Sequence, residues 1–260
     1  MPRTAILAHM DIESGANERI KRLVRLHQRR HRVAEGVFVV EGDEIEAALA
    51  SGLIPAELYR PETNGTEIPA EQTFVCSGRA LRKASYRSDP AAVIAVFPGF
   101  ATALDDLRYD DPAFVIIAEN LEKPGNLGAI LRTSSAAGVD AVVATGDIDP
   151  FNPNVIRASR GAVFSVQLTV ADIQSALDWS RSAGLQVVAA VSEGGKPPWS
   201  IDLKAATALV VGAEATGLTP GTIAAADMTV TIPMNGAVDS LNVSAAMAML
   251  SYEAVRQRSG

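Results

Sequence analysis

Short apolar runs recur through the second half of this 260-residue chain, and helical patterns separate several of them. The runs expected to form strands are 113–118, 141–144, 162–168, 186–190, 208–211 and 228–232. Strands that alternate with helices pair in parallel, because each helix carries the chain back across the sheet. Helices then cover both faces of such a sheet. We therefore expect an α/β fold with a mainly parallel sheet, closed by a long helix at 243–258.

The first part of the chain repeats this alternation on a smaller scale. Strands are expected at 37–42, 58–59, 73–76 and 92–97, and helices at 17–32, 44–51 and 79–84. The segment 98–112 mixes proline and glycine with four aspartates, which is typical of a linker. The predicted organisation is a small α/β domain over 1–104 and a larger domain over 105–260.

The net charge of −7 argues against a nucleic-acid partner, but the charge is unevenly distributed. Residues 1–104 carry thirteen basic and thirteen acidic side chains, whereas residues 105–260 carry ten and seventeen. The segment 15–35 has seven basic residues against two acidic ones. This cluster is either the solvated face of a helix or a set of phosphate contacts. The candidate RNA-binding residues in it are Arg22, Arg25, Arg29, Arg30 and Arg32.

Other features exclude several classes of protein. The single cysteine, Cys76, excludes an internal disulfide and a cysteine-based metal cluster, and we expect it to be a buried small side chain. No run of about 18 apolar residues is present, so no membrane span is expected. The start of the chain does not look like a secretory leader. A cytoplasmic protein without a metal fits these observations.

Three segments of the second half carry candidate chemistry. Residues 119–133 follow a strand and open a helix, yet they contain neither the dinucleotide motif GxGxxG nor the phosphate-loop motif GxxxxGK[ST]. An acidic ribose clamp at the expected distance is also missing, which argues against a nucleotide-dependent oxidoreductase. In 210–218, Glu214 follows a strand, so it either meets a ligand at the sheet edge or caps the next helix. In 232–246, Ser240 and Asn242 either line a site or cap the final helix.

Taken together, the three segments match a known family. The pattern NxGAIxRT at 126–133, the GAE at 212–214 and IPM…SLNVS at 232–244 resemble the TrmH/SpoU branch of the SPOUT methyltransferases, over about 110–258. The segment 157–165 is also similar to that family. The part before the linker is similar to the ribosomal-protein-like α/β RNA-binding domain that often precedes this catalytic domain.

The resemblance implies a fold, a cofactor and an assembly. The C-terminal domain would be an α/β-knot, in which the chain threads a loop as a deep trefoil knot. The cofactor would be S-adenosylmethionine, held by Gly212, Ile232, Met234 and Leu241. The site would lie at the interface of a homodimer that is built partly from the last helix. The activity would be methyl transfer to a ribose 2′-hydroxyl of RNA.

The resemblance also implies catalytic residues, which are Arg132, Asn126, Glu214, Ser240 and Asn242. A ribose hydroxyl must lose its proton as it attacks, but all three histidines precede residue 32. Arginine has a pKa above about 12 and is a poor base. Arg132 would therefore act through an RNA phosphate or orient the nucleotide, and we favour orientation with a phosphate contact. Asn126 and Asn242 would organise the site, and Glu214 would fix an arginine or the substrate ribose.

The expected target is RNA, and within RNA the large-subunit ribosomal RNA, because the extra N-terminal domain is typical of rRNA methyltransferases. Two alternatives stay open at this point. The acceptor could be a tRNA ribose, or the chain could be a non-catalytic RNA-binding or ribosome-assembly factor on the same fold. Binding of S-adenosylmethionine would separate the last possibility from the other two.

Overall fold

The computed structural model describes residues 11–62, 68–89, 93–236 and 240–259. These residues form two compact units. The N-terminal unit consists of the chain up to Phe100 together with Phe151–Pro153, and the C-terminal unit consists of Ala101–Pro150 and the chain from Asn154 onwards. Each unit has its own sheet and its own apolar core.

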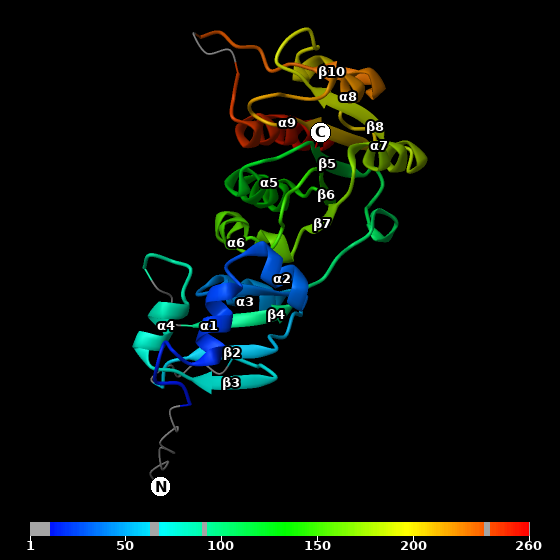
Figure 1. Cartoon of the computed structure of the whole chain (residues 1–260). Coiled ribbons are helices and arrows are strands. Elements are labelled where there is room, and N and C mark those ends of the chain that lie inside the picture. The colour runs from blue at the N-terminus through cyan, green and yellow to red at the C-terminus, as the bar shows by residue number, and fades with distance from the viewer. Residues whose placement is uncertain (1–10, 63–67, 90–92, 237–239, 260) are drawn as a thin grey trace. The chain divides into compact units, whose positions relative to one another are not determined.

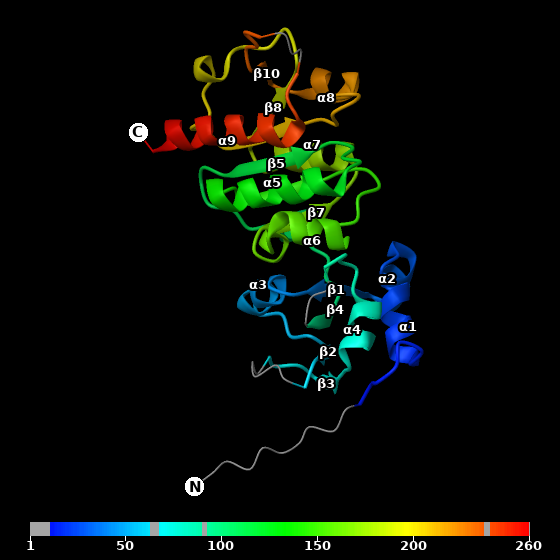
Figure 2. The same cartoon turned by 90° about the vertical axis from the view of Figure 1, so that its left-hand side faces the viewer.

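The N-terminal unit has a four-stranded sheet. In spatial order its strands are β1 (Val37–Glu41), β4 (Ile94–Pro98), β2 (Glu57–Arg60) and β3 (Gln72–Val75). Strand β4 runs antiparallel to both of its neighbours, and β2 pairs with β3 in parallel. Helices α1 (Glu18–Arg25) and α4 (Gly78–Ala84) cover one face, and Figure 2 shows α3 (Glu44–Ala50) on the other side of the sheet.

One residue in the core of this unit is the lone cysteine. Cys76 is buried between these elements, as the sequence predicted. Burial raises the pKa of its thiol to about 12, and the charge of Asp11 adds to the shift. The thiol is therefore neutral and protected in the folded unit.

The helix expected at 17–32 is in fact two helices, α1 and α2 (Arg29–Glu35). The chain leaves the helical conformation at Gln28, which has extended dihedrals. The buried side chain of Arg32 stabilises this break, because its Nη1 donates to the carbonyls of Leu26 (2.7 Å) and His27 (2.8 Å) at the end of α1. Helix α2 then ends at Gly36, which adopts a left-handed conformation.

The C-terminal unit has a six-stranded sheet in which every pair of strands is parallel. In spatial order its strands are β10 (Met228–Val230), β8 (Gln186–Ala190), β9 (Thr207–Val211), β5 (Phe114–Ala118), β6 (Ala141–Ala144) and β7 (Gln167–Val170). Strands β5, β6 and β9 are buried along their whole length. The predicted α/β fold with a mainly parallel sheet is confirmed.

Helices cover both faces of this sheet, as parallel pairing requires. They are α5 (Pro124–Ala137), α6 (Pro153–Ser159), α7 (Ile173–Ser182), α8 (Pro220–Ala225) and α9 (Val243–Arg258), with 3₁₀ turns η1 (Leu104–Asp106), η2 (Ala162–Phe164) and η3 (Pro198–Ser200). Figures 1 and 2 show α5 and α9 side by side on one face, while α7 lies on the other. No helix in the described ranges is long and apolar enough to cross a membrane.

The segment between β6 and β7 differs from the prediction. The apolar run 162–168 was expected to be a strand, but it begins as the 3₁₀ turn η2, and the strand starts only at Gln167. Just before it, the chain turns through Arg160 and Gly161, both at positive φ. Helix α6 also packs tightly on α5, because a Cβ added to Gly128 would lie 2.5 Å from that of Ala158. A short apolar run cannot show these tertiary contacts, so the strand was predicted, but with a start that is too early.

Candidate functional site

The candidate site lies at the edge of the parallel sheet where the strands end. The carboxyl ends of parallel strands share one edge, which is the usual ligand-binding edge of open α/β sheets. The segments that follow β5, β9 and β10 all start from this edge. They are the three segments that the sequence singled out, at 119–133, 210–218 and 232–246.

Four polar side chains from these segments meet in one cluster, which we call the polar cluster: Lys123, Asn126, Glu214 and Asn242. The Nδ2 of Asn242 donates to Oδ1 of Asn126 at 3.3 Å and to Oε1 of Glu214. On its other side, Oδ1 of Asn242 accepts from the backbone N–H of Ser244 at 2.9 Å. Asn242 thus caps α9 and also belongs to the polar cluster.

Lys123 is the member of the cluster that sequence reasoning missed. Its ammonium group forms an ion pair with Oε2 of Glu214. This hydrogen bond, followed by that of Asn126, holds the pKa of Glu214 below its ordinary value, and the same ion pair raises the pKa of Lys123. A signal was available: Lys123 immediately precedes the proline that starts α5 and lies three residues before Asn126. Glu214 was expected to fix an arginine or the substrate, and its protein partner is a lysine.

A buried carboxylate anchors the segment that carries Glu214. The side chain of Glu119, at the end of β5, is fully buried. It accepts hydrogen bonds from the backbone N–H of Thr219 (3.2 Å), from the Thr219 hydroxyl (2.9 Å) and from the Thr222 hydroxyl (2.9 Å). A buried carboxylate is tolerated only when it is bonded in this way. Glu119 thereby fastens the loop after β9 to the end of β5.

Two glycines allow close backbone approach at the same edge. A Cβ on Gly212 would lie 2.3 Å from the backbone carbon of Gly217, because the turn after β9 folds back on itself. A Cβ on Gly195 would lie 2.6 Å from the hydroxyl oxygen of Thr231. The loop that contains Gly195 follows β8 and pairs with the end of β10, where Lys196 N–H donates to Thr229 at 3.0 Å. The sequence had not indicated that this loop belongs to the edge.

The other residues expected at the cofactor lie on the segment after β10. Ile232, Met234 and Leu241 are half-buried, whereas Ser240 is exposed. Ser240 makes no hydrogen bond to any residue that the structure describes. The described part of this edge therefore offers a half-exposed apolar surface beside the tight glycine turns.

Arg132 does not join the polar cluster. It lies on α5 six residues after Asn126, which at about 3.6 residues per turn places the two side chains on different sides of the helix. Arg132 is exposed, and it forms no ion pair or hydrogen bond with the residues described. Its guanidinium group is thus available to a molecule from outside this chain.

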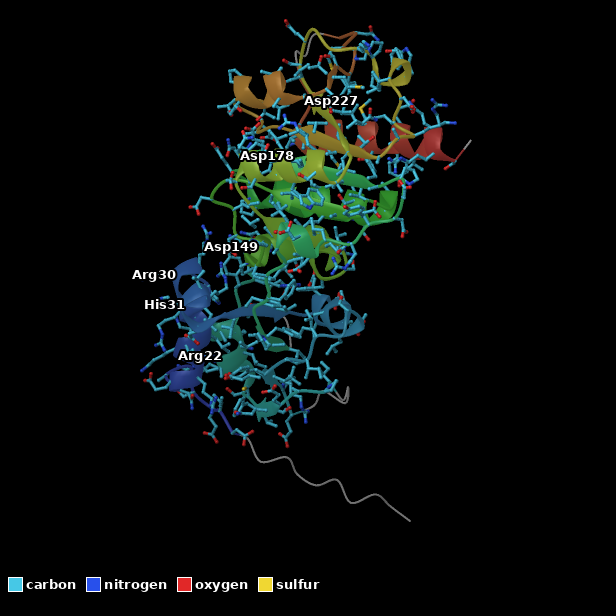
Figure 3. All side chains as sticks on the ribbon, turned by 90° about the vertical axis from the view of Figure 1, so that its right-hand side faces the viewer. Arg22, Arg30, His31, Asp149, Asp178 and Asp227 are labelled. Atoms are coloured by element: carbon cyan, nitrogen blue, oxygen red, sulfur yellow. The ribbon has the colours of Figure 1, made fainter. Side chains whose placement is uncertain are left out.

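The five candidate RNA-binding arginines do not share one environment. Arg32 is buried and bonds to the end of α1, which corrects its assignment as a phosphate contact. Arg22 is half-buried between Glu35 (2.6 Å) and Glu57 (3.0 Å), so its charge is already neutralised. Arg25, Arg29 and Arg30 are exposed, and Figure 3 labels Arg30 on α2. Three of the five therefore keep an accessible side chain.

No group of three or more potential metal ligands occurs among the residues placed in the structure.

Comparisons with known proteins identify two regions. Residues 113–252 match the SpoU rRNA Methylase family, and residues 17–95 match the MRM3-like substrate binding domain. The chain is 28% identical to a 23S rRNA (guanosine(2553)-2′-O)-methyltransferase, RlmP, of Bacillus subtilis, over 93% of this chain and 97% of the relative. It is 31% identical to an uncharacterised tRNA/rRNA methyltransferase of Synechocystis, over 99% and 97%.

Solved structures show the same likeness. A crystal structure described as an RNA 2′-O ribose methyltransferase is 39% identical, with a TM-score of 0.84 over 96% of this chain and 99% of the other. The SpoU methyltransferase AviRb of Streptomyces viridochromogenes, solved in complex with the cofactor AdoMet, is 26% identical, with a TM-score of 0.85 over 94% and 99%. An AdoMet-bound rRNA methyltransferase of Sinorhizobium meliloti is 28% identical, with a TM-score of 0.86 over 94% and 97%.

Proposed function

The chain belongs to the SpoU rRNA methylase family, and we propose that it transfers a methyl group from S-adenosylmethionine to a ribose 2′-hydroxyl of large-subunit ribosomal RNA. The observation that carries the proposal is the meeting of Asn126, Glu214 and Asn242, which come from three distant segments. Relatives named as 23S rRNA 2′-O-methyltransferases support the choice of RNA. We also propose that the enzyme acts in the cytoplasm, on the ribosomal RNA that is its proposed substrate.

The edge of the C-terminal sheet fits S-adenosylmethionine. The half-buried Ile232, Met234 and Leu241 offer an apolar surface for the adenine ring. Glycine is required at Gly212, because a side chain there would clash with the backbone of Gly217, and this keeps the turn at the end of β9 tight. When bound, this cofactor supplies a methyl group on a sulfonium, which is a good leaving group. The residues of the chain then have to position the acceptor hydroxyl and favour loss of its proton.

The polar cluster organises the site rather than serving as the base. Glu214 is paired with Lys123, and the raised pKa of Lys123 keeps that side chain protonated. Asn242 uses both ends of its amide, so its orientation is determined by its partners. We assign Asn126 and Asn242 to hydrogen bonds with the substrate ribose and its surroundings. Ser240 is an exposed hydroxyl nearby that can add one further contact.

Arg132 is the residue that we assign to the nucleotide itself. It is exposed on α5, which leaves its full charge for an RNA phosphate. Arginine stays protonated at neutral pH, so it acts by orienting the nucleotide and holding the phosphate beside the hydroxyl. The proton then passes to that phosphate or to water. All three histidines lie in the first 31 residues, which leaves no histidine base in the C-terminal unit.

Two finer features complete the proposal. We propose that the C-terminal unit forms the deep trefoil knot of its family, with the segment after β10 threaded through the neighbouring loops.

We also propose a homodimer, because α9 exposes Ala245, Met249 and Tyr252 at a spacing of four and three residues. Met249 and Tyr252 are about half exposed, at 54% and 52%, and form an apolar stripe that a second copy can cover.

The test compares ribose methylation of RNA from cells with and without the gene. We expect one 2′-O-methyl group to disappear from large-subunit rRNA in the deletion strain and to return with the wild-type gene but not with Asn126→Ala. Loss of a methyl group from tRNA instead would transfer the proposal to the tRNA alternative. Unchanged methylation in both RNAs, together with no heat of S-adenosylmethionine binding by calorimetry, would identify a non-catalytic factor.

A further inference from the structure

The N-terminal unit has one basic side and one acidic side. Its helices α1, α2 and α4 together contain ten lysines and arginines and only two acidic residues. Helix α3, on the other side of the sheet in Figure 2, has no basic residue, and it has three acidic ones when the N-cap residue Asp43 before it is included. The equal numbers of basic and acidic residues in this part of the chain therefore conceal a separation of charge, with basic helices on one side of the sheet and an acidic helix on the other.

Helix α4 contributes to the basic side in a way that the sequence analysis overlooked. It carries Arg79, Arg82 and Lys83 and no acidic residue, and it packs into the core through Ala80 and Leu81. All three basic side chains are exposed. None of them forms an ion pair or a hydrogen bond within the described ranges. These three positive charges on a two-turn helix thus have no counterion among the residues that the structure describes.

Helices α1 and α4 lie side by side, so their exposed faces adjoin. At one end, the Ser77 hydroxyl donates to the carbonyl of Glu13 at 2.6 Å. At the other end, Nε2 of His27 lies 2.9 Å from the carbonyl of Ala84. The two helices are in direct contact, and Arg25 of α1 and the three basic residues of α4 are all exposed on this helix pair.

Helix α1 also contains arginines whose charges are paired with carboxylates of the same unit. Arg22 binds Glu35 and Glu57, and Arg19 lies 3.8 Å from Glu57. The carboxylates of Glu35 and Glu57 are thus already paired with arginines of α1. Arg25, Arg79, Arg82 and Lys83 have no such partners in the described structure. A dense set of unpaired positive charges favours a partner with closely spaced negative charges, and a nucleic-acid backbone is such a partner.

We propose that Arg25, Arg79, Arg82 and Lys83 form a single RNA-phosphate-binding surface, which we call the α1–α4 basic face. This inference rests on the proposed function, because it assumes an RNA substrate. It extends the expected footprint from α1 and α2 to α4. The face binds backbone phosphates without reading the bases, so it supplies affinity and leaves the choice of nucleotide to the catalytic unit.

The experiment measures the salt dependence of binding to a labelled, deproteinised 23S rRNA transcript by filter binding, with the full-length protein. The variant Arg79→Gln/Arg82→Gln/Lys83→Gln should bind at least about tenfold more weakly at low salt, and the magnitude of its slope of log K against log salt should fall by about 2–3. A charge-matched control, Arg108→Gln/Arg181→Gln/Lys204→Gln in the C-terminal unit, should keep the wild-type slope. The charge-preserving pair Arg79→Lys/Arg82→Lys should keep it too.

The outcomes separate the two proposals. An unchanged slope in the α4 variant overturns the α1–α4 basic face, even if the wild-type protein methylates the RNA normally. A reduced slope that also appears in the charge-preserving pair overturns it as well, because helix damage would then be the cause. If the slope falls only in the Gln variant while the wild-type protein transfers no methyl group, the face stands and the proposed function fails. Calorimetry with S-adenosylmethionine, expected to be unchanged in the variant, monitors the integrity of the catalytic unit.

Discussion

The two units of the chain use their charged side chains in opposite ways. In the N-terminal unit, neighbouring arginines have different tasks: Arg32 and Arg22 are bound internally, whereas Arg25 and Arg30 are exposed. In the C-terminal unit, the charged pair Lys123–Glu214 and two asparagines from distant segments gather at one sheet edge. The N-terminal unit thus has exposed basic residues on several helices, whereas the polar groups of the C-terminal unit meet in one cluster at the sheet edge.

This difference follows from what each surface has to do. A surface that binds phosphates needs many weak, similar contacts, and the loss of one of them changes affinity modestly. A site that aligns two reacting groups needs a few side chains held in place by neighbours, and the loss of one of them changes the rate strongly. The structure supplies such support at the C-terminal edge through the buried bonds of Glu119 to Thr219 and Thr222. The two units should therefore respond differently to single substitutions.

The largest effect is expected from Arg132→Ala. Removing the group that orients the nucleotide should lower the rate of methyl transfer on the order of 100-fold or more, because the contact is needed as the hydroxyl attacks. The affinity for S-adenosylmethionine, measured by calorimetry, should stay near the wild-type value. Arg181→Ala removes an exposed arginine of α7 on the other face of the sheet and serves as the control. Near-normal turnover in Arg132→Ala would contradict the assignment.

Arg32→Gln should affect stability and leave RNA binding alone. The substitution removes charged hydrogen bonds to two carbonyls at the end of α1, which should cost about 1.5–3 kcal/mol of unfolding free energy. Labelling of the buried Cys76 thiol in denaturant reports the unfolding of this unit. Arg30→Gln should do the reverse, with stability within about 0.5 kcal/mol of wild type and a salt slope lower by about 1. Weaker RNA binding by Arg32→Gln without a loss of unfolding free energy would show that Arg32 contacts RNA as Arg30 does.

Gly128→Ala tests the packing behind the catalytic edge. The new Cβ would meet Ala158 at 2.5 Å and the backbone N–H of Ser159 at 3.0 Å, so α6 would have to move away from α5. We expect destabilisation of about 1–3 kcal/mol in chemical denaturation. Gly125→Ala in the same helix has nothing within 4 Å and should be neutral or stabilising by up to about 1 kcal/mol. Equal stability of the two variants would show that the α5–α6 contact is looser than described.

The smallest effect concerns the titration of Glu214. Its pKa is held below the ordinary value of 4.5, first by the hydrogen bond from Lys123. For a carboxyl with a lowered folded pKa, the stabilisation is present above the unfolded value and is lost as the pH falls through the folded pKa. Lys123→Gln should therefore move the Glu214 midpoint, followed by carboxyl NMR, upward toward 4.5. A midpoint that does not move would assign the shift to Asn126 and Asn242 alone.

The sequence predicted the elements that depend on local pattern. The buried runs of β5, β6 and β9 and the long helices α5 and α9 were found, because their apolar residues follow each other closely or repeat with helical period. The strand expected at 162–168 starts only at Gln167, because the first residues of that run form η2, which packs against α5. The break at Gln28 was missed for a similar reason, since it depends on a bond from Arg32 back to the end of α1.

The residues of the site also divide into those that a local motif predicts and those that depend on contacts between distant segments. Asn126, Glu214 and Asn242 were found because each lies in a motif, and the resemblance to a family joined the motifs. Lys123 was missed because its partner Glu214 is 91 residues away, and no local spacing connects them. Arg79, Arg82 and Lys83 were overlooked because three basic residues on a short helix are unremarkable until the structure shows that α4 adjoins α1.

Ribose methylation by this protein can be measured in vitro, as methyl transfer from S-adenosylmethionine carrying a labelled methyl group to 23S rRNA from cells that lack this gene. A methyl group on a ribose 2′-oxygen blocks alkaline cleavage of the next phosphodiester bond. We expect the label in a single alkali-resistant dinucleotide, and we expect Asn126→Ala to abolish it. Label recovered in ordinary mononucleotides, on a base, would overturn the proposed ribose methylation.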